Sequence, residues 1–143
     1  MRKHLIFILL FLLMSTPTFA QTVHQKDRWG AKLFYFQDNT MQVKDRWGTK
    51  LAWFDVEEQA VHQKDRWGAK LLFIDDNTVR QKDRWGAPLL FFDGPTIRQK
   101  DRWGQALYFL DGNVLKQKDR WGQPVYYFDF APAKWQLAAL ILL

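Results

Sequence analysis

The chain has 143 residues, with 21 lysines and arginines against 15 aspartates and glutamates and a formal net charge of +6. Aromatic residues make up 17% of the sequence, a share that excludes an intrinsically disordered chain. It has no cysteine, which excludes disulfides, thiolate metal sites and a thiol nucleophile.

The first twenty residues predict a secretory signal peptide. Arg2 and Lys3 form a basic start, residues 5–14 are an apolar run, and Ala20 ends the polar stretch that follows. The apolar run is too short for a membrane span of about 20 residues, so we expect cleavage after Ala20 rather than a retained anchor. The mature chain would carry a net charge of +4, would not span a membrane, and would be periplasmic or secreted.

Residues 21–130 are a tandem repeat. The pentapeptide KDRWG occurs six times, with successive copies 18 residues apart except for one spacing of 20. A short fixed period predicts one supersecondary unit copied around an axis or along a line. Equal copies also argue against an active site, because catalysis needs a few unlike residues placed asymmetrically.

Each unit predicts a β-hairpin with KDRWG at its turn. Asp27 and its copies would cap the turn, and Gly30 and its copies would adopt the left-handed conformation beside a bulge. The strand before each turn alternates apolar and basic residues, whereas the strand after it is apolar on both faces and needs cover on both. Tight turns such as those at residues 93–94 join successive hairpins, which leaves no room for helices and gives twelve short strands.

Residues 131–143 read APAKWQLAALILL and predict a short apolar helix about 20 Å long, too short to cross a bilayer. Twelve strands closed in a ring leave a lumen that side chains alone do not fill, so we expect this helix in the ring centre. The alternative is a short final strand or a frayed tail. The fold class that follows is an all-β repeat protein, a closed ring or shallow barrel of six antiparallel hairpins around a C-terminal helix.

The Arg-Trp pair of each turn is the candidate binding surface. One interpretation is an exposed aromatic and cationic rim, which suits sugars or lipid headgroups. The other is packing of each Trp on the neighbouring hairpin with cation–π support, and the repetition in every unit favours it. The rim would consist of Arg28, Trp29, Arg46, Trp47, Arg66, Trp67, Arg84, Trp85, Arg102, Trp103, Arg120 and Trp121.

Other polar residues predict neither a cofactor nor a metal site. The six turn aspartates are explained by capping, since calcium needs converging oxygens and glycoside hydrolysis needs two unlike carboxylates. His24 and His62 stand where other repeats carry Arg or Lys, no third ligand is evident, and we expect solvated strand residues. The mature chain has no serine either, so we predict that it is not an enzyme.

The KDRWG repeats of residues 21–130 resemble the bacterial β-flower proteins, which are shallow symmetric assemblies of β-hairpins. The resemblance is best preserved in residues 71–129. That family is similar in layout to the tubby C-terminal domain and the phospholipid scramblases, whose twelve-stranded barrels surround a C-terminal apolar helix. The resemblance implies the same place for residues 131–143 and a lipid- or membrane-related role, but it transfers no site residues. The pair Trp121-Gly122 followed by Tyr126-Tyr127-Phe128-Asp129 also resembles the choline-binding cell-wall repeats, which implies an open solenoid.

Together these observations predict a non-enzymatic, exported module of the bacterial envelope. Its partner would be an anionic lipid or an envelope glycan, bound through the basic strand face and the Trp/Arg rim. The alternative is a cell-wall glycan-binding solenoid of tandem aromatic repeats. Export and the modest charge argue against nucleic acid as a partner.

Overall fold

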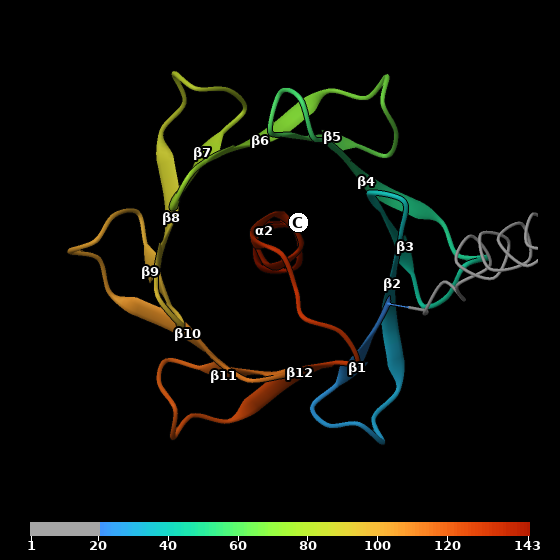
Figure 1. The fold of residues 1–143 in the computed structure, drawn as a ribbon, viewed down its shortest axis with the longest axis vertical. Coiled ribbons are helices and arrows are strands. Elements are labelled where there is room, and N and C mark those ends of the chain that lie inside the picture. The colour runs from blue at the N-terminus through green and yellow to red at the C-terminus, as the bar shows by residue number, and fades with distance from the viewer. Residues whose placement is uncertain (1–20) are drawn as a thin grey trace, which may run out of the picture.

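The computed structural model describes residues 21–143 as a closed antiparallel barrel of twelve strands around one helix (Figure 1). β1 pairs with β12 and closes the ring. This confirms the predicted fold class and rules out an open solenoid; the predicted signal peptide lies outside the described residues. The elements are β1 (Gln21–Gln25), β2 (Lys32–Gln37), β3 (Thr40–Val43), β4 (Lys50–Asp55), β5 (Ala60–Gln63), β6 (Lys70–Asp75), β7 (Thr78–Gln81), β8 (Pro88–Asp93), β9 (Thr96–Gln99), β10 (Ala106–Asp111), β11 (Val114–Gln117), β12 (Pro124–Phe128) and α2 (Lys134–Leu142).

Two kinds of turn alternate around the barrel. Each KDRWG turn joins an odd-numbered strand to the next even-numbered one, and a bulge interrupts the pairing of those two strands in every repeat. Two-residue turns such as Asp38-Asn39 join the repeats, with four residues in the one exception between β4 and β5. Because the strands run alternately up and down, all six KDRWG turns lie at one end of the barrel. We call it the KDRWG end and the other the opposite end.

The inner wall is formed by one face of every strand. The buried apolar residues of the odd strands are less than 2% exposed: Val23, Met41, Val61, Val79, Ile97 and Leu115. The even strands bury the row Phe36, Phe54, Ile74, Phe92 and Phe128, with Leu110 partly buried. This settles which face of the even strands points inward. The other face of the even strands points outward, and its row of aromatic residues that begins with Tyr35 is half-buried.

Helix α2 covers the inner wall. Its residues from Trp135 to Leu140 are all buried, as expected for a helix that is apolar on every side and surrounded on every side. Trp135 stacks on Phe54, with ring centroids 5.1 Å apart, and meets Phe36 edge-on at 5.3 Å. A helix lacks sixfold symmetry, so the inner positions of the repeats differ where they surround it: Phe34, Ala52, Leu72, Leu90, Tyr108 and Tyr126.

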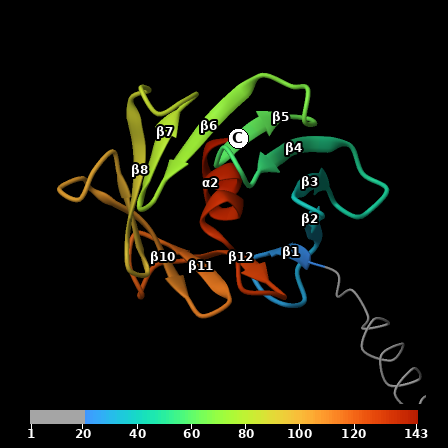
Figure 2. The same ribbon diagram turned by 45° about the horizontal axis from the view of Figure 1, so that its top comes forward.

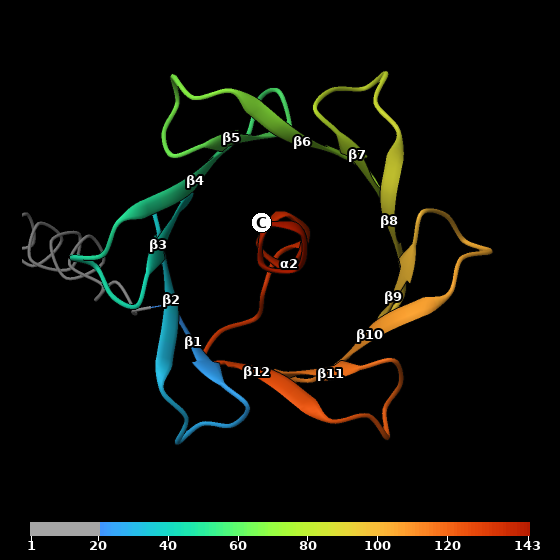
Figure 3. The same cartoon turned by 180° about the vertical axis from the view of Figure 1, so that it is seen from behind.

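The helix starts at the opposite end. The Lys134 ammonium donates to the Asn77 side chain at 2.8 Å and to the Asp76 carbonyl at 3.2 Å, both in the turn between β6 and β7. From there α2 runs along the inside of the barrel (Figure 2), and the view from behind also shows it inside the ring of strands (Figure 3). Its last residue, Leu143, is 55% exposed. Among residues 21–143, no helix has both the length and the apolar character that a membrane span requires.

Candidate binding surface

All six KDRWG turns share one hydrogen-bond pattern. The Asp27 side chain accepts from the Trp29 amide at 2.9 Å, and the Asp27 carbonyl accepts from the Gly30 amide at 2.9 Å. The other five turns repeat both bonds at 2.9–3.0 Å. The predicted capping role of these aspartates is therefore confirmed, and each carboxylate serves its own turn.

The predicted left-handed glycine in these turns is wrong. Lys26 and its five equivalents hold the positive φ instead, at 64–69°, and this rotation lets each lysine amide donate to a carbonyl of the preceding repeat at 2.8–2.9 Å. Lys26 bonds in this way to Val125, which joins the first repeat to the last. Glycine is needed for a different reason, since a Cβ on Gly30 would lie 1.7 Å from the Gln25 carbonyl oxygen.

A side-chain N–H fastens each turn to its strand. The donors include the His24 Nδ1 at 3.1 Å from the Gly30 carbonyl, the Gln42 amide and the Arg98 guanidinium. Different residue types occupy this position because each can reach the last carbonyls of the turn. The prediction that both histidines are solvated is wrong for His62, which is 7% exposed and makes the same bond to Gly68 at 2.9 Å.

The six turn tryptophans are 81–86% exposed. The favoured interpretation, that each Trp packs on the neighbouring hairpin, is therefore wrong. Instead, the turn arginines contact aromatic rings. In four turns the guanidinium lies 4.7–5.9 Å from the ring of its own Trp. Arg66 and Arg120 also lie 5.8 Å from the rings of Trp53 and Phe109, respectively, in the preceding repeat. All twelve predicted rim residues are exposed, and Figure 1 shows their turns as lobes around the periphery.

Open grooves separate neighbouring lobes. One of about 860 Å³ lies between Tyr35 of the first repeat and Lys44, Arg46 and Trp47 of the second turn. Grooves of about 290, 550 and 380 Å³ repeat this arrangement with Trp53, Phe73 and Phe109. The sequence did not assign these aromatic residues to the surface, although their strands, apolar on both faces, carried the signal.

Charge is divided between the two ends of the barrel. The KDRWG turns hold twelve lysines and arginines against six aspartates. The turns and strand ends of the opposite end carry nine acids, and five of them are paired with a lysine or arginine at 2.8–3.8 Å. The pairs are Glu58 with Lys70, Asp75 with Arg80, Asp76 with Lys134, Asp93 with Arg98 and Asp111 with Lys116. The acids of that end are Asp38, Asp55, Glu57, Glu58, Asp75, Asp76, Asp93, Asp111 and Asp129.

No family model, curated protein or solved structure matches this chain. The resemblances to the β-flower proteins and to the choline-binding repeats therefore stay predictions. The binding surface rests on the geometry of the barrel alone: exposed indole rings, guanidinium groups beside them, and a basic end facing away from an acidic one.

Proposed function

We propose that the protein binds anionic lipid surfaces with its KDRWG end and has no catalytic role. The observation that carries this proposal is the exposure of six tryptophans, 81–86% each, at one end of a closed barrel. Six exposed indole rings leave apolar area in water, and contact with a partner surface would bury it.

The chemistry of the KDRWG end fits the headgroup region of a bilayer. Indole rings concentrate at the membrane–water interface, where the ring is shielded and its N–H stays hydrated. Each lysine or arginine near an anionic leaflet contributes about 1 kcal/mol of attraction. Six equivalent turns on one rigid ring add their weak contacts without further ordering cost. The acidic opposite end would be repelled, which fixes the orientation.

Co-sedimentation with vesicles tests this function. Purified protein is expected to pellet with phosphatidylglycerol vesicles at 50 mM salt, to be released progressively as salt rises, and to ignore phosphatidylcholine vesicles. Changing all six turn tryptophans to alanine should weaken binding at least tenfold, and changing the six turn arginines to glutamine should remove most of the salt dependence. Retention of full binding by both variants would refute the proposal.

The control places charge changes at the opposite end. Asp38→Asn combined with Glu57→Gln raises the net charge by two in exposed turns that the proposal leaves away from the membrane. Vesicle binding by this variant should stay within about twofold of the unmodified protein. A large increase would mean that net charge rather than the KDRWG end drives association.

Acidic glycans are a second candidate ligand, because aromatic walls and cations line the grooves between lobes. A sugar ring could stack on Tyr35 or Phe73, and Arg46 or Arg84 could pair with its carboxylate. Tyr35 and Phe73 lie outside the KDRWG turns, so lipid binding depends on them less than glycan binding would. Pelleting with an insoluble anionic polysaccharide, lost in a Tyr35→Ala, Phe73→Ala variant that still binds vesicles, would support this function.

A further inference from the structure

The second repeat departs from the others by two residues, and this insertion creates a cluster found in none of the other described repeats. A four-residue turn replaces the usual two between β4 and β5. It brings Glu58 beside Asp55, the last residue of β4, and His62 of β5. One potential ligand atom from each of the three lies within 4.8 Å of the other two.

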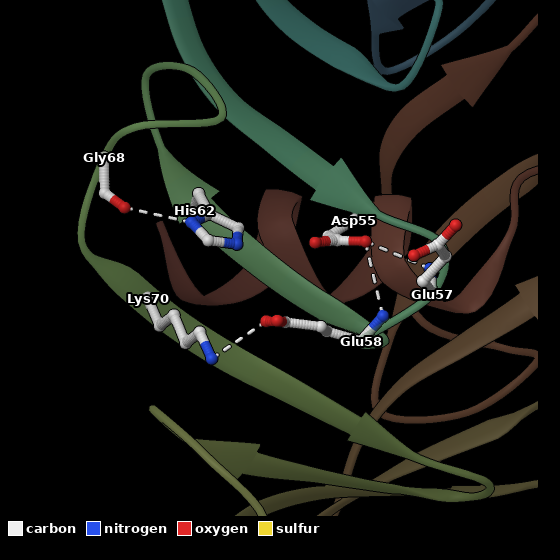
Figure 4. Close-up of polar contacts among 6 residues, drawn as sticks. All are labelled: Asp55, Glu57, Glu58, His62, Gly68 and Lys70. Atoms are coloured by element: carbon white, nitrogen blue, oxygen red, sulfur yellow. Dashed lines mark hydrogen bonds and ion pairs between the residues drawn. The ribbon is translucent and has the colours of Figure 1, made fainter.

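His62 is oriented as a metal ligand would be. Its side chain is buried, and its Nδ1 lies 2.9 Å from the Gly68 carbonyl, which can only accept, so Nδ1 carries the proton. In the neutral imidazole Nε2 is then the unprotonated nitrogen, and it is buried with no hydrogen-bond partner among the described residues. Figure 4 shows this nitrogen on the side of the ring that faces the two carboxylates. Metal-binding histidines commonly donate their second N–H to a backbone carbonyl in this way.

The two carboxylates are also held in place. One Asp55 oxygen accepts from the Glu57 and Glu58 amides at 3.0 and 3.3 Å, and the other faces His62 in Figure 4. Glu58 pairs through Oε2 with the Lys70 ammonium at 2.8 Å, which leaves Oε1. The hydrogen bond and the negative charge of Glu58 raise the pKa of Lys70 above its ordinary value.

We propose that Asp55, Glu58 and His62 bind a zinc ion, with a fourth position open to water. One imidazole and two carboxylates suit Zn²⁺, whereas Ca²⁺ takes six to eight oxygens. Ligands about 2.1 Å from zinc in a tetrahedron stand about 3.4 Å apart, so the ligand atoms, which lie within 4.8 Å of one another, must close in by at most about 1.4 Å. Glu58 is exposed on a turn and can make this movement. The expectation that the histidines lack a third ligand is thereby revised for His62.

His24 provides the internal comparison. It forms the same Nδ1 contact with a turn carbonyl, at 3.1 Å. However, no glutamate accompanies it, and the nearby Asp129 carboxylate accepts from the Thr22 amide at 2.8 Å. If a single imidazole in this position were enough to bind zinc, His24 and His62 would bind it equally.

Isothermal titration of the untagged protein with zinc chloride tests the site. We expect one zinc per chain, a loss of affinity of at least tenfold in both His62→Gln and Glu58→Gln, and no change in His24→Gln. His62→Gln should fold normally, because Gln42 occupies the same position in another repeat and donates to its turn carbonyl at 3.1 Å. Zinc should also shift the ¹⁵N resonance of the His62 Nε2 and leave His24 unmoved.

Several results would overturn the proposal. These are no zinc binding, equal zinc affinity in the unmodified protein and His62→Gln, an equal loss in His24→Gln, or binding of calcium chloride more tightly than of zinc chloride. Vesicle binding by His62→Gln is expected to be unchanged, since the cluster lies outside the KDRWG turns. The zinc site and the lipid surface can therefore fail independently.

Discussion

Replacing Gly86 with alanine is expected to lower the free energy of unfolding by about 3 kcal/mol. A Cβ at this position would lie 1.6 Å from the Gln81 carbonyl oxygen and 2.6 Å from its carbon, both of them backbone atoms that cannot rotate away. The surroundings are also fixed, because the Gln81 amide donates to the Ala87 carbonyl at 2.9 Å. The turn must therefore open before the methyl group fits.

Gly94→Ala is the matched control. Gly94 has a φ of +59°, and an added Cβ would meet nothing within 4 Å. The cost there is the left-handed conformation alone, about 1 kcal/mol. Urea denaturation of both variants followed by circular dichroism measures the difference. Equal losses would show that the close approach within the KDRWG turn is not what requires glycine.

Trp135→Ala is expected to destabilise the barrel by about 3–5 kcal/mol. The indole is 7% exposed and contacts Phe54 and Phe36 with ring centroids 5.1 and 5.3 Å away, so its removal leaves a cavity between helix and wall. Trp85→Ala removes the same side chain from a site where it is 86% exposed, and should change stability by no more than about 0.5 kcal/mol.

Thermal unfolding of the two tryptophan variants distinguishes a helix that supports the barrel from one that merely occupies it. A large drop in midpoint for Trp135→Ala and almost none for Trp85→Ala is the expected pair of results. Similar midpoints for both would mean that α2 contributes little to stability, and that the twelve strands are held by their own hydrogen bonds.

The repeat allowed the architecture to be predicted because its period, its turn residues and its strand patterning agreed. The helical C-terminus followed from a volume argument: twelve strands enclose more space than Val79 and its equivalents can fill. The inward face of the even strands could not be predicted, since both faces are apolar. It depends on the row headed by Phe36 packing against one particular helix.

Local geometry at the turns was harder to predict. Glycine suggested a left-handed residue, but the positive φ belongs to Lys26 and its equivalents. The cost of that conformation is offset because each lysine amide gains a hydrogen bond to the preceding repeat. The recurrence of Trp29 in every repeat suggested that each Trp packs on the neighbouring hairpin. An exposed binding residue copied in every repeat gives the same sequence pattern, so the sequence cannot separate the two. The cluster of Asp55, Glu58 and His62 could not be predicted, because it depends on the conformation of the four-residue turn and on the pairing of β4 with β5.

Tryptophan emission on vesicles of lipid brominated along the acyl chains tests the central claim most directly. Six of the eight tryptophans are exposed in the KDRWG turns. Binding to anionic vesicles should shift the emission to shorter wavelength, and bromines near the headgroup should quench it more strongly than bromines near the bilayer centre. Vesicle binding with unshifted, unquenched emission would show that the KDRWG end faces away from the membrane, and would contradict the proposed function.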